Sequence, residues 1–144
     1  MATPQDILDV LKAAYQLWDE SKGHDPSGFI DLMADDFTLK SIMGVPLASS
    51  TQMRSGPAEA DTYFEQLIQS WEMIHYTVER FVSDDMGNIV MLGSFEWKYR
   101  ETGKSVSGPK MDHWIFNLDG KATSLFEMFD TAALMLATGE AKLP

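Results

Sequence analysis

The sequence predicts an α+β fold, with helices on one face of an antiparallel sheet. In the first half of the chain, apolar residues recur at spacings of three and four, which is the period of an amphipathic helix. In the second half the pattern changes to alternation, and Asp119-Gly120 between two apolar runs is a strong hairpin signal. With 144 residues, 44% of them hydrophobic, the chain can bury a core, and we expect a single domain over 1–144.

Three helices are expected, at 4–21, 27–34 and about 57–73. The first has an apolar stripe that includes Tyr15 and Trp18, and Thr3 followed by Pro4 is typical of a helix start. Residues 43–56 contain turn formers without a clear period and are expected to form a loop.

Five strands are expected, at 37–42, 76–82, 89–100, 110–118 and 121–130. Residues 101–109 contain glycine and serine and read as a connection. If Asp119 and Gly120 form a two-residue turn, Leu118 pairs with Lys121 and Asp112 lies opposite Glu127.

Alternation then gives the last hairpin two faces. One face is predicted to carry Asp112, Trp114, Phe116, Leu125, Glu127 and Phe129. The other is predicted to carry Met111, His113, Ile115, Phe126, Met128 and Asp130. Both faces are rich in apolar groups, so we expect one to face the helices and the other to form a homodimer.

Asp112 opposite Glu127 is the most specific local feature, because like charges on directly paired residues are unfavourable. Beside apolar neighbours, at least one carboxyl is expected to have a raised pKa and to act as a donor that polarises a carbonyl. The alternative is a solvated pair, or one neutralised by Lys98 or Lys110.

Composition excludes several classes of partner. Eleven Lys and Arg against 22 Asp and Glu give a net charge of −11, which argues against nucleic acid and anionic membranes. No apolar run reaches the length of a membrane span, and the N-terminus lacks the pattern of a secretory signal, so a cytoplasmic location is expected. There is no cysteine, and the three histidines lack metal-ligand spacing, so we expect neither a metal nor a cofactor.

The order of elements, with MADDFTL, SGPAEADTYFEQL and MDHWIFNLDGK, resembles the nuclear-transport-factor-2-like superfamily. The branches that it is most similar to are the SnoaL-like polyketide cyclases and the ketosteroid-isomerase-like proteins. The resemblance implies a cone, or cystatin-like α+β barrel, in which a strongly curved antiparallel sheet packs on three helices. It also implies an apolar pocket and dimerisation through the outer sheet face.

Some residues of the isomerase pattern carry over. LKAAYQLWD is similar to the segment that holds a donor tyrosine, which implies this role for Tyr15. MDHWIF is similar to the strand with a protonated aspartate, which implies a donor role for Asp112. In ADDFTLKSI the position of the base is Ser41, which cannot accept a carbon-acid proton, so steroid isomerase activity is not expected.

The last strand offers two acidic candidates. Glu127 lies where other branches place an acidic residue, and Asp130 in FEMFDTAAL is similar to an aspartate of SnoaL-like cyclases. Glu127 is preferred because the predicted faces place it with the pocket.

Two kinds of function follow. The first is binding of a small hydrophobic carbonyl compound, with Tyr15, Asp112 and Glu127 as a cofactor-independent isomerase, cyclase or hydratase site. The ligand-binding residues would then be Trp114, Phe116, Leu125, Phe129 and Ser41. The second is a non-enzymatic ligand-binding or protein-interaction module of the same fold.

Overall fold

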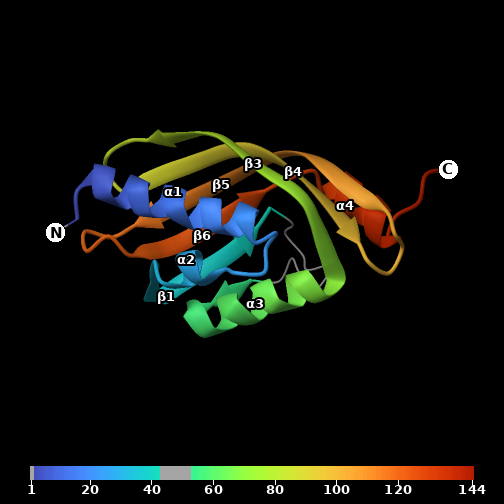
Figure 1. Ribbon diagram of the computed structural model, residues 1–144, viewed down its shortest axis with the longest axis horizontal. Coiled ribbons are helices and arrows are strands. Elements are labelled where there is room, and N and C mark those ends of the chain that lie inside the picture. The colour runs from blue at the N-terminus through green and yellow to red at the C-terminus, as the bar shows by residue number, and fades with distance from the viewer. Residues whose placement is uncertain (1, 43–52) are drawn as a thin grey trace.

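The computed structural model describes residues 2–42 and 53–144, and its six strands form one curved, unclosed sheet (Figure 1). The strands are β1 Met33–Ser41, β2 Arg54–Ser55, β3 Trp71–Ser83, β4 Asn88–Tyr99, β5 Ser105–Phe116 and β6 Ala122–Met128. Their order across the sheet is β2-β1-β6-β5-β4-β3. Neighbouring strands run antiparallel except β1 and β6, which are parallel. The predicted α+β class is confirmed.

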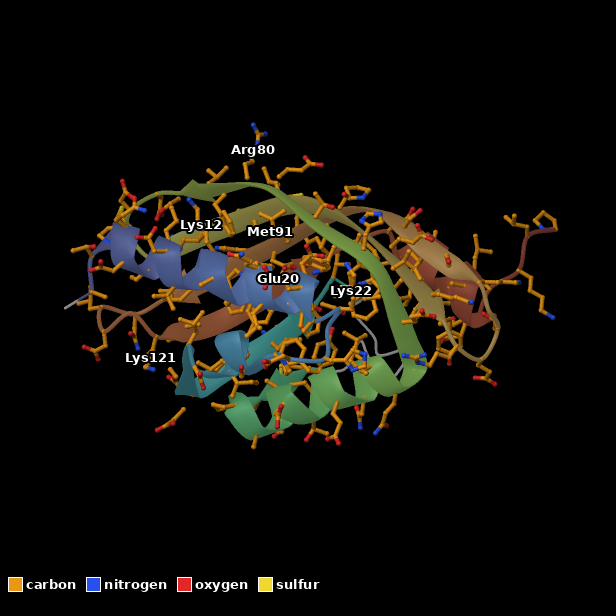
Figure 2. All side chains as sticks on the ribbon, viewed as in Figure 1. Lys12, Glu20, Lys22, Arg80, Met91 and Lys121 are labelled. Atoms are coloured by element: carbon orange, nitrogen blue, oxygen red, sulfur yellow. The ribbon has the colours of Figure 1, made fainter. Side chains whose placement is uncertain are left out.

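Four helices accompany the sheet: α1 Pro4–Glu20, α2 Ser27–Ile30, α3 Gly56–Ser70 and α4 Thr131–Thr138. The first three lie on one side of the sheet, and α4 packs against β4 and β5 at the far end of the molecule (Figure 1). Charged side chains such as Arg80 point away from the molecule (Figure 2). No helix in the described ranges is long and apolar enough to cross a membrane.

The start and the buried stripe of α1 follow from its sequence. Thr3 and Asp6 form a capping box, in which each side chain accepts a hydrogen bond from the other's backbone N–H at 3.1 Å. The buried stripe includes Tyr15 and Trp18, less than one turn apart on the same face. The helix therefore directs both rings toward the inner face of the sheet.

The curvature of the sheet arises where β3 and β4 pair. The pairing register shifts twice along β3, between Met73 and His75 and between Val78 and Arg80. Gly93 of β4 lies opposite Val78, and a Cβ at Gly93 would come within 2.2 Å of the Thr77 carbonyl oxygen. The bend therefore requires glycine at this position.

Several element bounds differ from those expected. The second helix ends at Ile30 instead of Ala34, because Asp31 and Leu32 form a turn and Met33 then enters the core in extended conformation as the start of β1. The third helix ends at Ser70, so Trp71 and Met73 belong to β3. Residues 43–52 of the expected loop lie outside the described residues. Helix α4 and the early start of β5 at Ser105 were not predicted.

The predicted two-residue turn is wrong, although most of the predicted register is correct. Asn117 N–H donates to the Lys121 carbonyl, which leaves a three-residue loop with Gly120 at φ +79°. This shifts the pairing by one residue, so Phe116 pairs with Ala122 and not with Thr123. A bulge at the next pair restores the register, and Asp112 lies opposite Glu127 as expected.

Candidate active site

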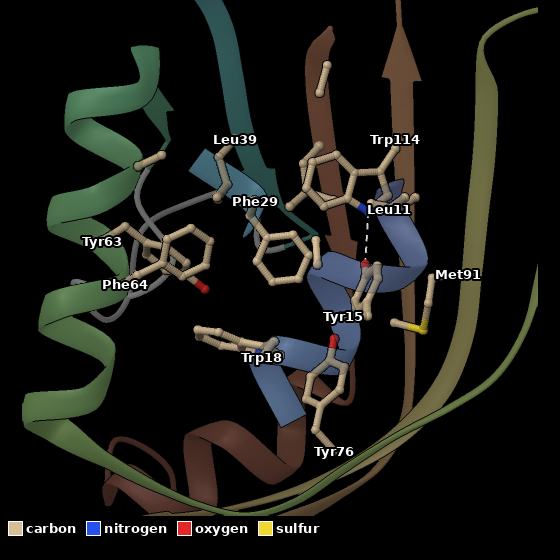
Figure 3. Close-up of a cluster of buried hydrophobic side chains, with 14 of the residues drawn as sticks. Leu11, Tyr15, Trp18, Phe29, Leu39, Tyr63, Phe64, Tyr76, Met91 and Trp114 are labelled. Carbon is tan, nitrogen blue, oxygen red and sulfur yellow. Dashed lines mark hydrogen bonds between the residues drawn. The ribbon is translucent and has the colours of Figure 1, made fainter. Parts of the chain in front are cut away.

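A cavity of about 80 Å³ lies between the inner face of the sheet and α1, α2 and α3. Its walls are mainly aromatic and include all four tryptophans of the chain, Trp18, Trp71, Trp97 and Trp114. Strand β5 runs along the cavity from Val106 to Trp114, and Leu134 of α4 lines it as well. Figure 3 shows rings from α1, α2 and α3 around this space, with Tyr63 and Phe64 facing Trp18. The core of the fold therefore encloses a space that its own side chains do not fill.

The predicted faces of the last hairpin are confirmed by burial. Asp112 and Glu127 are 3% and 8% exposed, whereas Met111 and Ile115 on the opposite face are 39% and 38% exposed. Asp130 is exposed and its carboxylate caps α4 by accepting from Ala133 N–H at 3.0 Å. It lies away from the cavity, and its observed role is structural.

Asp112 accepts hydrogen bonds from three donors. Its Oδ2 accepts from the Tyr15 hydroxyl at 2.5 Å and from the Tyr76 hydroxyl at 3.2 Å, and its Oδ1 accepts from the Lys110 ammonium. The Trp114 indole N–H, which can only donate, reaches the Tyr15 oxygen at 2.8 Å (Figure 3). The Tyr15 proton is therefore directed to Asp112. This differs from the expected donor role of Asp112, because the groups around it are themselves donors.

Glu127 has fewer partners. Its Oε2 accepts from the Tyr63 hydroxyl at 3.1 Å, and its Oε1 lies 3.7 Å from Lys110 Nζ. Burial raises the pKa of the Glu127 carboxyl above its ordinary value; Lys110 opposes this shift and the Asp112 charge adds to it. A raised pKa was expected for one member of the pair.

Lys110 is the counterion of both carboxylates. Burial would lower the pKa of its ammonium, but the charges of Asp112 and Glu127 outweigh this and raise it. Of the two lysines considered as neutralising groups, Lys110 therefore takes this role, while Lys98 is exposed. The tyrosines stay protonated, because burial foremost, and then the nearby carboxylates, raise the pKa of Tyr15, Tyr63 and Tyr76 well above its ordinary value.

Three of the predicted ligand-binding residues, Trp114, Leu125 and Phe129, line the cavity. Phe116 does not, because it lies beyond Trp114 along β5. Its ring packs against the Trp114 indole, with the two ring centroids 6.1 Å apart. Ser41 is also absent from the described lining of the cavity; it pairs with Glu127 across the parallel strands β1 and β6.

Sequence reasoning did not identify Tyr63 and Tyr76 as members of the site. Tyr63 lies on the buried stripe of α3 and Tyr76 on the buried face of β3, where both pass as core residues. Lys110 carries the clearer signal, because it lies two residues before Asp112 on the same face of the strand.

Solved structures share this fold. An NTF2-like protein of unknown function from Burkholderia pseudomallei is similar with a TM-score of 0.78 and 18% identity, over 91% of this chain and 95% of that one. TerC co-crystallised with polyporic acid is similar with a TM-score of 0.77 and 19% identity, over 92% and 98%. A protein from Mesorhizobium loti named as a SnoaL-like polyketide cyclase has a TM-score of 0.70 and 17% identity, over 85% and 98%. At these identities the likeness shows the fold alone.

A search of curated proteins finds no match. The SnoaL-like domain family matches residues 11–125, which is most of the chain and includes Tyr15, Lys110 and Asp112. The chain therefore belongs to the SnoaL-like domain family, within the NTF2-like fold.

Proposed function

We propose that the cavity binds a small, mainly apolar carbonyl compound and that Glu127 transfers a proton to or from it, as an isomerase or cyclase does. The observation that carries this proposal is a buried carboxyl with a raised pKa in an aromatic cavity, where the Tyr63 hydroxyl donates to it. A carboxyl whose pKa approaches the working pH is effective both as base and as acid.

The aromatic walls support the choice of an apolar ligand. Rings from six elements, α1, α2, α3, β3, β4 and β5, surround the space. Its charged groups gather where Lys110, Asp112 and Glu127 meet. A planar molecule would contact the rings, and its carbonyl oxygen would lie at this polar end. Structure neighbours named as polyketide cyclases support the same reaction class.

Hydrogen exchange tests proton transfer without knowledge of the natural substrate. Small aromatic ketones such as acetophenone and β-tetralone are incubated in heavy water with the protein, and deuterium entry next to the carbonyl is followed by NMR. We expect Glu127→Gln to slow exchange by about a hundredfold or more. Glu72→Gln, a change at an exposed carboxylate on β3, is the matched control. Equal exchange rates for wild type and Glu127→Gln would contradict the proposal.

The second candidate is a ligand-binding protein without turnover. Ser41 at the position of the isomerase base favours it, because a serine hydroxyl is not basic enough to take a proton from carbon. Binding is measured by intrinsic fluorescence, since all four tryptophans line the cavity. Ketone binding with no exchange above the rate without protein would support this candidate over the enzyme.

We also propose that the outer sheet face forms a homodimer. Met111, Ile115 and Ile74 are each more than a third exposed on β5 and β3, and half-buried Phe126 and Met128 lie on the same face of β6. Exposed apolar residues on one face of a sheet are typical of interfaces. Light scattering of the purified protein tests the mass expected for two copies.

A further inference from the structure

Lys110 is a buried cation that faces the cavity. The residue is 8% exposed, lines the cavity, and lies among the aromatic walls close to the two carboxylates. Lysine is rarely buried to this degree, and its ammonium loses most of its hydration when it is. Such a site calls for partners that replace the lost water.

The ammonium has more hydrogens than bonded partners. It carries three N–H groups. One donates to Asp112, while the Glu127 oxygen at 3.7 Å is an ion-pair contact beyond hydrogen-bond length. Across 2–42 and 53–144, the remaining N–H groups have no hydrogen-bonded protein oxygen. Even when a second N–H group is assigned to Glu127, the third is available to an oxygen atom of a bound molecule.

The Asp112 carboxylate is fixed by hydrogen bonds to the oxygen that does not contact Lys110. Its Oδ2 receives the hydroxyls of Tyr15 and Tyr76, and Trp114 in turn fixes the Tyr15 oxygen. The carboxylate therefore cannot rotate without breaking these bonds, and its Oδ1 sets the position of Lys110. This arrangement orients a charged donor before a ligand arrives, as electrostatic catalysis requires.

We propose that the Lys110 ammonium binds the carbonyl or enolate oxygen of the substrate, and that Tyr15, Tyr76 and Trp114 position it through Asp112. The inference rests on the proposed function and names the substrate class as compounds with an acidic C–H beside a carbonyl. A carbonyl oxygen bound to Lys110 would lie near Glu127, because the two side chains are 3.7 Å apart, and the C–H on the carbon beside the carbonyl would then be within reach of the Glu127 carboxylate.

The step balances within the site. Glu127 takes the proton from the carbon, the C–H electron pair forms a C=C bond, and the C=O π pair moves to the oxygen, where Lys110 stabilises the charge. Glu127 then returns the proton to the same or a conjugated carbon. No oxidant, reductant or further reactant is needed.

The test uses two probes that differ in one oxygen, para-nitrophenol and nitrobenzene. At a pH where free para-nitrophenol is partly ionised, we expect binding to wild type to increase the absorption of the nitrophenolate ion. We expect Lys110→Met to lose this increase and to bind para-nitrophenol about tenfold or more weakly, because a charge-assisted hydrogen bond is lost. Binding of nitrobenzene should change little. Lys98→Met, at an exposed lysine on β4, is the control.

A second pair of variants covers the case in which Lys110→Met does not fold. The double variant Lys110→Met/Asp112→Asn removes both charges of the Lys110–Asp112 ion pair, so neither is left buried without its partner. We expect this variant to lose the increase in nitrophenolate absorption as well. For the positioning residues, Tyr15→Phe should reduce the ionised fraction of bound probe without abolishing it. Tyr99→Phe, at a tyrosine outside the cavity lining, should leave it unchanged.

The outcomes separate the two proposals. If wild type binds both probes equally and without added ionisation, the role of Lys110 is overturned, while ligand binding in the cavity stands. The same holds if Lys110→Met keeps the ionised probe. If neither probe binds, both proposals fail. Loss of ionisation in the Lys110 variants, with a smaller reduction in Tyr15→Phe and no change in Lys98→Met and Tyr99→Phe, supports the inference.

Discussion

The inner and outer faces of the β5–β6 hairpin each carry some residues of the polarity that is usual for the other face. The inner face buries Lys110, Asp112 and Glu127, while on the outer face Met111 and Ile115 are more than a third exposed. Buried charges are costly unless they are paired, and exposed apolar residues add little to the stability of a monomer. The comparison teaches that neither face is arranged for stability alone, which is what the proposed site on the inner face and the proposed interface on the outer face would require.

The largest loss of stability is expected when Asp112, the shared acceptor on the inner face, is removed. Asp112→Ala leaves the Lys110 ammonium and the Tyr15 and Tyr76 hydroxyls without their shared partner. We expect the free energy of unfolding to fall by about 3–5 kcal/mol, measured by urea denaturation. Glu72→Ala, at an exposed carboxylate, should change it by no more than about 0.5 kcal/mol. A similar small change for Asp112→Ala would show that the buried network contributes nothing to folding.

Single hydroxyls distinguish the two carboxylates within this face. Tyr15→Phe leaves the Trp114 N–H unpartnered and removes a donor to Asp112, so a loss of about 1–3 kcal/mol is expected. Tyr63→Phe removes the tyrosine hydroxyl that donates to Glu127, with a loss of about 0.5–1.5 kcal/mol. Because that hydrogen bond lowers the pKa of Glu127, the variant should raise it further. NMR titration of the carboxyl measures this, and an unchanged or lower pKa would contradict the assigned bond.

The pH dependence of stability gives a smaller effect with a defined sign. The pKa of Glu127 is higher in the folded than in the unfolded protein, mainly through burial, so the folded state binds the proton more tightly. Its contribution to stability is complete below about pH 4.3, the ordinary glutamate value, and is lost as pH rises through the folded pKa. In Glu127→Gln this loss should be absent. Unfolding curves of both proteins across this range measure the difference, and parallel curves would mean that Glu127 is not perturbed.

The smallest effect on folding is expected on the outer face. Ile115→Lys, at a residue 38% exposed, should change the stability of one copy by no more than about 0.5 kcal/mol. It should nevertheless dissociate the proposed dimer, because a charge would enter its apolar centre. Light scattering measures the mass. A variant that keeps the mass of two copies would place the interface elsewhere.

Sequence reasoning predicted the architecture well because it depends on repeated patterns. The apolar stripe of α1 and the alternation on β5 and β6 each depend on several residues, so an error at one position does not change the predicted element. The mistaken turn at Asp119-Gly120 illustrates this, since a bulge restored the register of Asp112 with Glu127. Helix α4 was missed because its apolar residues show no helical stripe.

The site was predicted only in part, because its partners come from distant segments. Tyr15 was identified through the resemblance, whereas Tyr63 and Tyr76 share the site with residues about 64 and 36 positions away in sequence. The donor role expected for Asp112 depended on where nearby protons point. Only the contacts with Lys110, Tyr15 and Tyr76 reveal that direction.

The parallel pairing of β1 with β6 has a consequence for the order in which the protein forms during synthesis. Strand β1 at 33–41 lies between β2 and β6, so one of its edges has no partner until the ribosome has produced residues 122–128. Contacts of such long sequence separation form late, and an open strand edge is exposed to association with other chains. The residue that completes this edge beside Ser41 is Glu127. The newly made chain therefore acquires its proposed proton-transfer group in the same step that pairs this edge of β1.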